Sequence, residues 1–346
     1  MDNINSLQKN VFVVLGMSRS GTSAIARSLA AMGVDLGNRL LEGDSRNPKG
    51  FYEDSDILYK INRGVSAAID YHWIDFGDNE KQIENNPALR DYKNYAVGLL
   101  CERFINSLNW GFKDPRTVTI LPFWQSVFKA LNVNEHYILA VRNPLASAVS
   151  NQKFAKTDME AGLLLWIKIL KQMIDGTENK KRVLISYEMM LQNPHHQLER
   201  VQHAFNLTAT HEQITNYTNE FLDKKLQHHV YTDEDLKTHP AMAIAPIAMK
   251  MYELVMRVAR DEIQLDSDEF KTAWVAIKNE FSDISPTHAY IEQLARRNKQ
   301  LERQLRTIRK SFPYKLIYPL RMIDDLLRLY RRKSKRLMKL TESYEQ

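Results

Sequence analysis

The chain contains almost no cysteine and no long apolar run, and both absences exclude classes of protein. Cys101 is the only cysteine among 346 residues, so neither a disulfide framework nor a cysteine-based zinc site is available. Its apolar, helix-like surroundings predict a small buried side chain rather than a catalytic thiol. No segment approaches the roughly 20 apolar residues of a membrane-spanning helix, and residues 1–10 lack the apolar core of a signal peptide. We therefore expect a soluble, cytoplasmic protein.

The charged residues are unevenly distributed along the chain. The net charge is +6, yet the stretch from Tyr290 to the end holds 16 lysines and arginines against 6 acidic residues, a net charge of +10. The preceding 289 residues therefore carry a net charge of −4. The basic character belongs to the C-terminal segment, and attraction to an anionic partner is expected there.

Four short apolar runs predict β-strands, and a helical pattern follows each of them. The runs are residues 11–15, 110–112, 137–141 and 183–185. Repeated alternation of strand and helix predicts an α/β fold, with a parallel sheet covered by helices on both faces. Residues 211–284 have mostly helical patterns. We therefore expect an α/β domain over residues 1–284 and a basic helical extension over residues 285–346.

The extension contains two amphipathic segments. The first has apolar residues at spacings of three and four with one polar member, in the order Ile291, Leu294, Asn298, Leu301, Leu305 and Ile308. This is a heptad seam, and asparagine at a core position favours a two-stranded pairing, hence a homodimer. The second seam runs over residues 316–330 among arginines and lysines. It suits an anionic membrane surface better than a nucleic acid. Packing on the chain's own domain is the alternative for both segments.

Residues 16–23, with the sequence Gly-Met-Ser-Arg-Ser-Gly-Thr-Ser, lie between the first predicted strand and helix. Backbone N–H groups and a helix start converge on an anion in such a loop. The spacing matches the Walker motif, but Thr22 occupies the position of the Walker lysine. The strong cation is instead Arg19, whose planar fork suits a phosphate or sulfate. The loop thus predicts an anion site other than that of a nucleoside-triphosphate hydrolase.

This loop resembles the 5′-phosphosulfate loop of sulfotransferases that use 3′-phosphoadenylyl sulfate (PAPS). The resemblance implies a P-loop-like fold, with PAPS as donor and no metal. It also implies that Arg19 contacts the reacting sulfuryl group and that the loop holds the 5′-phosphate. The donor-binding residues of the loop are then Ser18, Arg19, Ser20, Gly21, Thr22 and Ser23.

A second anion site is predicted after the third strand. Arg142 ends that strand, and Asn143-Pro144 then forms a strong helix start. Arg142 and Ser150 are eight residues apart, the offset with which the family binds the 3′-phosphate of its donor. The resemblance, which covers about residues 10–207, also implies that Tyr187 lies near the adenine.

The resemblance implies that Lys113, at the end of the second strand, helps to hold the sulfuryl group. Arg116 either adds positive charge or pairs with Asp114, and the sequence leaves both readings open. Cytosolic family members carry a histidine two residues after the lysine, but Pro115 is at that position here. The base must therefore come from elsewhere.

Glycan-modifying members of the family use a glutamate from the loop after the first helix instead, so the resemblance implies that a carboxylate in residues 41–54 takes the proton of the acceptor hydroxyl. Residues 47–54 resemble a segment of bacterial sulfotransferase-like proteins. The candidates are Glu42, Asp44, Glu53 and Asp54, and Glu53 is our choice among them. Its alternative role is a carboxylate at a helix N-terminus. His72 is a poorer candidate.

The resemblance implies sulfuryl transfer from PAPS to an acceptor hydroxyl, catalysed by positioning and cations as in phosphoryl transfer. Residues 311–321 resemble a tail of bacterial surface-polysaccharide enzymes, which favours a surface glycan or lipid-linked saccharide as acceptor. The enzyme would then work in the cytoplasm, at the inner face of the membrane. Two alternatives are a P-loop kinase for a small molecule and a non-catalytic scaffold of the same fold at the membrane.

Overall fold

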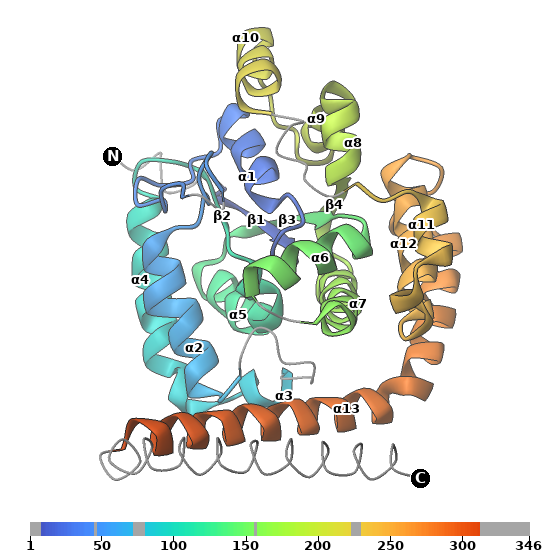
Figure 1. Cartoon of the computed structure of the whole chain (residues 1–346). Helices are drawn as coiled ribbons and strands as arrows, with labels where there is room; N and C mark the ends of the chain where they lie inside the picture. Colours follow the sequence, from blue (N-terminus) through green and yellow to red (C-terminus); the bar gives the residue numbers. More distant parts are fainter. Residues whose placement is uncertain (1–7, 45–46, 72–79, 156–157, 223–229, 312–346) are drawn as a thin grey trace, which may run out of the picture. The chain divides into compact units, whose positions relative to one another are not determined.

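The computed structural model of the chain describes residues 8–44, 47–71, 80–155, 158–222 and 230–311 (Figure 1). The chain forms two compact units, Met1–Pro286 and Thr287–Gln346. The first unit contains the sheet and every predicted site residue that is described. The second amphipathic segment of the tail and His72 lie outside the described residues.

The predicted α/β fold is confirmed. Four parallel strands form one sheet in the order β2-β1-β3-β4. The strands are β1 (Asn10–Gly16), β2 (Asn109–Lys113), β3 (Asn134–Val141) and β4 (Lys181–Ser186). Each coincides with one of the predicted apolar runs. A parallel sheet is buried on both faces, which is why these strands have continuous apolar sequences instead of alternating ones.

Helices cover both faces of the sheet (Figure 1). Phe12 and Val14 of β1 belong to a buried cluster with side chains of α1 (Thr22–Ala31) and α9 (Pro194–Phe205). On the other face, the Phe112 ring of β2 packs at a tilt against the Trp124 ring of α5 (Leu121–Leu131), with 4.8 Å between ring centroids. Because successive side chains of a strand point to opposite faces, one apolar run supplies both cores.

The connections between the strands contain most of the remaining helices of the first unit. Between β1 and β2 lie η1 (Ile57–Asn62), α2 (Arg63–Ala68), α3 (Glu80–Ile83), η2 (Pro87–Leu89) and α4 (Arg90–Arg103). After β2 come η3 (Pro115–Ile120) and α5, and after β3 come α6 (Pro144–Ala155) and α7 (Met159–Gly176).

The described residues after β4 form helices joined by short loops and contain no strand, as was predicted for residues 211–284. Its elements are α8 (Tyr187–Gln192), α9, α10 (His211–Asn216), η4 (Tyr217–Phe221), α11 (Asp233–Thr238), η6 (Pro240–Ala243), α12 (Pro246–Ala259) and α13 (Asp268–Lys310). Helix α12 packs against β4 and α7, and so extends the core beyond the sheet edge.

One detail differs from the predictions. Cys101 is exposed rather than buried, because it follows Leu100 on α4 and one residue turns the helix by about 100° away from its buried side. The division between the two units after Pro286 lies close to the predicted domain boundary after residue 284, and helix α13 continues across it. Proline removes one backbone hydrogen bond, and here this local loss does not end the helix.

The first seam of the tail lies on α13, so its predicted helical structure is confirmed. Leu294, Leu301, Leu305 and Ile308 are each 44–52% exposed. Their pairing with a second chain stays a prediction. In the described part of the chain, no helix is both long and apolar enough to cross a membrane.

Candidate functional site

The glycine loop after β1, the end of β2 and the turn after β3 meet at the carboxyl edge of the sheet. Together with residues from the segments 41–63 and 187–222, they line a cleft of about 550 Å³. Strand β1 lies between β2 and β3. The chain leaves β1 towards β2 on one side, whereas it leaves β3 towards β4 on the other side. A crevice therefore opens between the carboxyl ends of β1 and β3, where ligands bind in such folds. The predicted site residues that line this cleft are Ser18, Arg19, Gly21, Thr22, Ser23, Glu53, Lys113, Arg142 and Tyr187.

The backbone of the glycine loop is held in a left-handed conformation at two positions. Gly21, which caps α1, has φ 77°, and a Cβ there would lie 2.1 Å from the Tyr187 ring. Only glycine fits this position. Arg19 has φ 72° without being glycine, a conformation that costs about 1–3 kcal/mol and often marks ligand-binding sites. The loop therefore stores strain at the residue that was predicted to contact the sulfuryl group.

Arg142 and Ser150 are both joined to this loop. The Arg142 guanidinium donates a 2.9 Å hydrogen bond to the backbone carbonyl of Arg19, and Arg19 Nε donates to Ser150 Oγ at 3.0 Å. The Arg142 guanidinium also lies 5.1 Å from the Tyr187 ring centroid. The two predicted anion sites are therefore parts of one site.

Arg142, which is buried, and Glu188, which is half-buried, are ionisable groups on the strand-end side of the site. Burial lowers the pKa of Arg142, an effect that Glu188 partly opposes, and burial also raises the pKa of Glu188. Glu188 accepts hydrogen bonds from the Asn143 backbone and the Ser186 hydroxyl. The desolvated guanidinium of Arg142 would gain from a bound anion.

Ser20 differs from its predicted role. Its side chain is 1% exposed, shares a 3.3 Å hydrogen bond with Ser147 and does not line the cleft. Its backbone N–H donates to the Met17 carbonyl at 3.2 Å. The N–H groups at the start of α1 are thus the better anion donors, because a helix leaves its first N–H groups without intrahelical partners.

Lys113 and Glu53 form a buried ion pair in the wall of the cleft. Lys113 Nζ lies 2.8 Å from Glu53 Oε1 and also donates to the Phe51 carbonyl at 2.9 Å. Their side chains are 3% and 10% exposed. The Phe51 carbonyl accepts a second hydrogen bond from the Ser23 hydroxyl. The predicted base and the predicted strand-end cation are therefore placed directly together, next to the start of α1.

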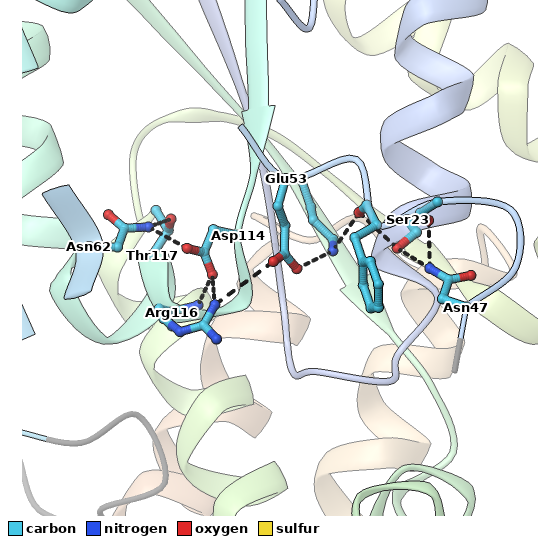
Figure 2. Close-up of polar contacts among 10 residues, drawn as sticks. Ser23, Asn47, Glu53, Asn62, Asp114, Arg116 and Thr117 are labelled. Atoms are coloured by element: carbon cyan, nitrogen blue, oxygen red, sulfur yellow. Dashed lines mark hydrogen bonds and ion pairs between the residues drawn. The ribbon is translucent and has the colours of Figure 1, made fainter. Parts of the chain in front are cut away.

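A polar network continues from Glu53 to the helix η1. Arg116 lies 3.9 Å from Glu53 and 2.8 Å from Asp114, so the structure supports both readings of Arg116. Asn62 donates to Asp114 at 2.9 Å and accepts from the Trp124 indole at 2.8 Å. The network fixes Arg116 on the side of Glu53 opposite Ser23 (Figure 2).

The other carboxylates of residues 41–54 have different positions. Asp54 accepts from the backbone of Asp56 and Ile57 at the start of η1 and pairs with Arg103 at 2.8 Å. Asp54 therefore holds the helix N-terminus, the alternative role considered for Glu53, and its burial raises its pKa. Glu42 and Asp44 do not line the cleft.

Several residues of the site were not predicted from the sequence. Asn47 donates to Ser23 Oγ at 3.2 Å and to the Gly50 carbonyl at 2.6 Å, and so ties residues 47–53 to the glycine loop. Likewise, Asn62 hydrogen bonds to Asp114, and Ser147 hydrogen bonds to Ser20 of the glycine loop. The only sequence signal for a role of Asn47 was its place in residues 47–54, the segment that resembles bacterial sulfotransferase-like proteins. The sequence held no such signal for Asn62, because its partner Asp114 is 52 residues away.

No metal centre is indicated in this part of the molecule. Among the described residues, no group of three or more histidine, cysteine or carboxylate side chains is arranged to hold a metal ion. The charges that face the cleft are mainly those of arginine and lysine.

No protein-family model and no curated protein matches the chain. Solved structures with a similar fold include the sulfotransferase domain of the Synechococcus PCC 7002 olefin synthase, at 13% identity and a TM-score of 0.39, covering 80% of this chain and 96% of that one. A sulfotransferase domain of the curacin biosynthetic pathway has 16% identity and a TM-score of 0.37, covering 80% and 98%.

A third similar structure is retinol dehydratase in complex with androsterone and the inactive cofactor PAP. It has 14% identity and a TM-score of 0.32, and the match covers 81% of this chain and 83% of that one. At these identities and TM-scores, an activity has to be inferred from the residues of the cleft themselves.

Proposed function

We propose that the protein is a PAPS-dependent sulfotransferase, which moves a sulfuryl group to the hydroxyl of a surface glycan or lipid-linked saccharide. The observation that supports this most is the convergence of Arg19, Lys113 and Arg142 on one cleft with a glycine loop. The three cations come from the ends of three different strands. A donor with a phosphosulfate and a separate 3′-phosphate needs charge at both positions.

The residues of the cleft fit this donor. Arg142 and Ser150, both joined to Arg19, would hold the 3′-phosphate. The backbone at the start of α1 would hold the 5′-phosphate. Tyr187, which packs on Gly21 beneath the Arg142 guanidinium, would contact the adenine. PAPS supplies the activated sulfuryl group when bound.

The remaining residues act on the transfer. Arg19 and Lys113 would stabilise negative charge on the sulfuryl oxygens and the departing phosphate. Glu53 would accept the proton of the acceptor hydroxyl as the new sulfate-ester bond forms and the bond to the phosphate breaks. Lys113 holds the Glu53 carboxylate in place through the 2.8 Å ion pair.

Calorimetric titration with adenosine 3′,5′-bisphosphate (PAP), AMP and ATP tests the donor assignment. One charge-assisted hydrogen bond contributes about 1.5–3 kcal/mol, so PAP should bind about tenfold or more tightly than AMP. The variant Arg142→Ala should lose this preference, and Arg90→Ala, an exposed arginine at the start of α4, should keep it. Equal affinity for PAP and AMP, or turnover of ATP, would refute the assignment.

A further inference from the structure

The cleft has a second end, on the far side of the Lys113–Glu53 pair from the predicted nucleotide. The nucleotide end is defined by Arg142 and Tyr187 against the glycine loop. Asn62 of η1 donates a hydrogen bond to Asp114, Asp114 pairs with Arg116, and Arg116 lies 3.9 Å from Glu53. These contacts place η1 and the first residue of α2 on the other side of Glu53. An acceptor that gives its proton to Glu53 therefore meets η1 and α2.

Leu58, Tyr59 and Arg63 are the residues of η1 and α2 that line the cleft. Tyr59 and Arg63 are four positions apart and lie on one side of the helix. The Arg63 guanidinium lies 4.6 Å from the centroid of the Tyr59 ring, and both side chains are exposed. The ring supports the face of the guanidinium and leaves its N–H edge open to a ligand.

The charge of Arg63 distinguishes it from its neighbours. Arg116 pairs with Asp114 and Glu53, and Lys60 pairs with Asp56 at 2.8 Å. Within the described part of the chain, no carboxylate forms an ion pair with Arg63. A guanidinium that a ring holds at the rim of a cleft, without an acidic partner, is suited to a carboxylate of the substrate.

We propose, on the basis of the proposed function, that the acceptor is an acidic saccharide whose carboxylate binds Arg63 while its hydroxyl faces Glu53. Arg63 is then a specificity-determining residue, and Tyr59 positions it. The proposed acceptor is then a sugar of the uronic acid type.

Binding of a matched pair of probes tests this proposal. 4-Nitrophenyl β-D-glucuronide and 4-nitrophenyl β-D-glucoside share the ring, its 2-, 3- and 4-hydroxyls and the aglycone, and differ at carbon 6. Titrated calorimetrically into the PAP-saturated full chain, the glucuronide should bind about tenfold or more tightly, as expected for one charge-assisted contact. Arg63→Ala should make the two affinities equal. Lys60→Ala, which removes an exposed cation three residues away, should leave the difference intact.

The outcomes separate this inference from the proposed function. Equal affinities in the wild-type protein, absence of glucuronide binding, or a preference that survives Arg63→Ala would each refute the acidic acceptor. If PAP itself does not bind, the proposed function fails. The glucuronide titration without PAP, with the same two variants, then still decides whether Arg63 binds a carboxylate. Because the Arg63 side chain is exposed, the Arg63→Ala variant should melt at the same temperature as the wild-type protein. An unchanged melting temperature shows that the substitution acts locally.

Discussion

Lys113 Nζ and Glu53 Oε1 lie 2.8 Å apart, and each of the two side chains is almost completely buried. One comes from the end of β2 and the other from the loop that precedes η1. Neither charge is stable in this place without the other, because isolated charges are strongly disfavoured in a protein interior. The pair therefore serves both the stability of the loop and the chemistry proposed for it.

The first prediction concerns this coupling. Removing one partner leaves an uncompensated buried charge, so Lys113→Met and Glu53→Gln should each lower the free energy of unfolding by about 3 kcal/mol. The double variant should lose clearly less free energy of unfolding than the two single variants together. Urea denaturation of the four proteins measures the coupling energy. Lys250 and Glu280, 2.7 Å apart on the exposed surface, form the control pair and should show a coupling below about 1 kcal/mol. Equal coupling in the two pairs would contradict the prediction.

The second prediction concerns the base. Glu53→Gln should lower turnover by about 10²–10⁴-fold, because the amide cannot accept the acceptor proton. Transfer of label from ³⁵S-PAPS to the 4-nitrophenyl saccharides measures it, with PAP affinity as a check that the cleft is intact. Glu42→Gln should remain active, since Glu42 does not line the cleft. Full activity of Glu53→Gln, together with an inactive Glu42→Gln or Asp44→Asn, would transfer the role to another carboxylate.

The third prediction concerns pH. His136 of β3 packs against the rings of Phe12 and Phe205 and lies 3.2 Å from Asn10. Burial, helped by the nearby Lys181 charge, lowers its pKa from 6.5 to about 4. Between these values the unfolded chain binds the proton and the folded chain does not, so stability falls as pH falls from 6.5 towards 4.

Chemical denaturation at several pH values measures this loss. The variant His136→Gln should have a flatter stability profile over the same window. His203→Gln, on an exposed position of α9, is the matched control and should follow the wild-type profile. If the two variants show the same profile, His136 is not the group responsible.

The fourth prediction concerns the tail, whose second segment lies outside the described residues. Each basic residue near an anionic membrane contributes about 1 kcal/mol, and the apolar seam adds burial. Removing residues 312–346 should abolish co-sedimentation with anionic vesicles and preserve both PAP affinity and melting temperature, because the whole cleft is formed before residue 223. If the truncated protein melts at a much lower temperature and the full chain does not bind anionic vesicles, the tail has a structural role instead.

Local features of the site could be predicted from the sequence. The apolar runs of the strands, the glycine loop and the Asn143-Pro144 helix start each depend on residues within a few positions of one another. In the structure, Asn143 Oδ1 accepts from the Leu145 and Ala146 backbone as expected of a cap. The parallel order of strands then brings the loop ends to one edge of the sheet.

The partners of the cleft residues were decided by the tertiary structure. Glu53 and Asp54 are adjacent in the sequence, yet one faces Lys113 and the other Arg103. Successive side chains of an extended segment point in opposite directions, and only its packing against β2 and α4 decides which carboxylate faces the cleft. The contacts of Asn62 with Asp114 and of Arg19 with Ser150 join residues 52 and 131 positions apart. The sequence by itself determined the strands and the anion loop, because backbone chemistry is local. The tertiary structure chose the carboxylate and the positioning network, because those contacts exist only once distant segments pack together.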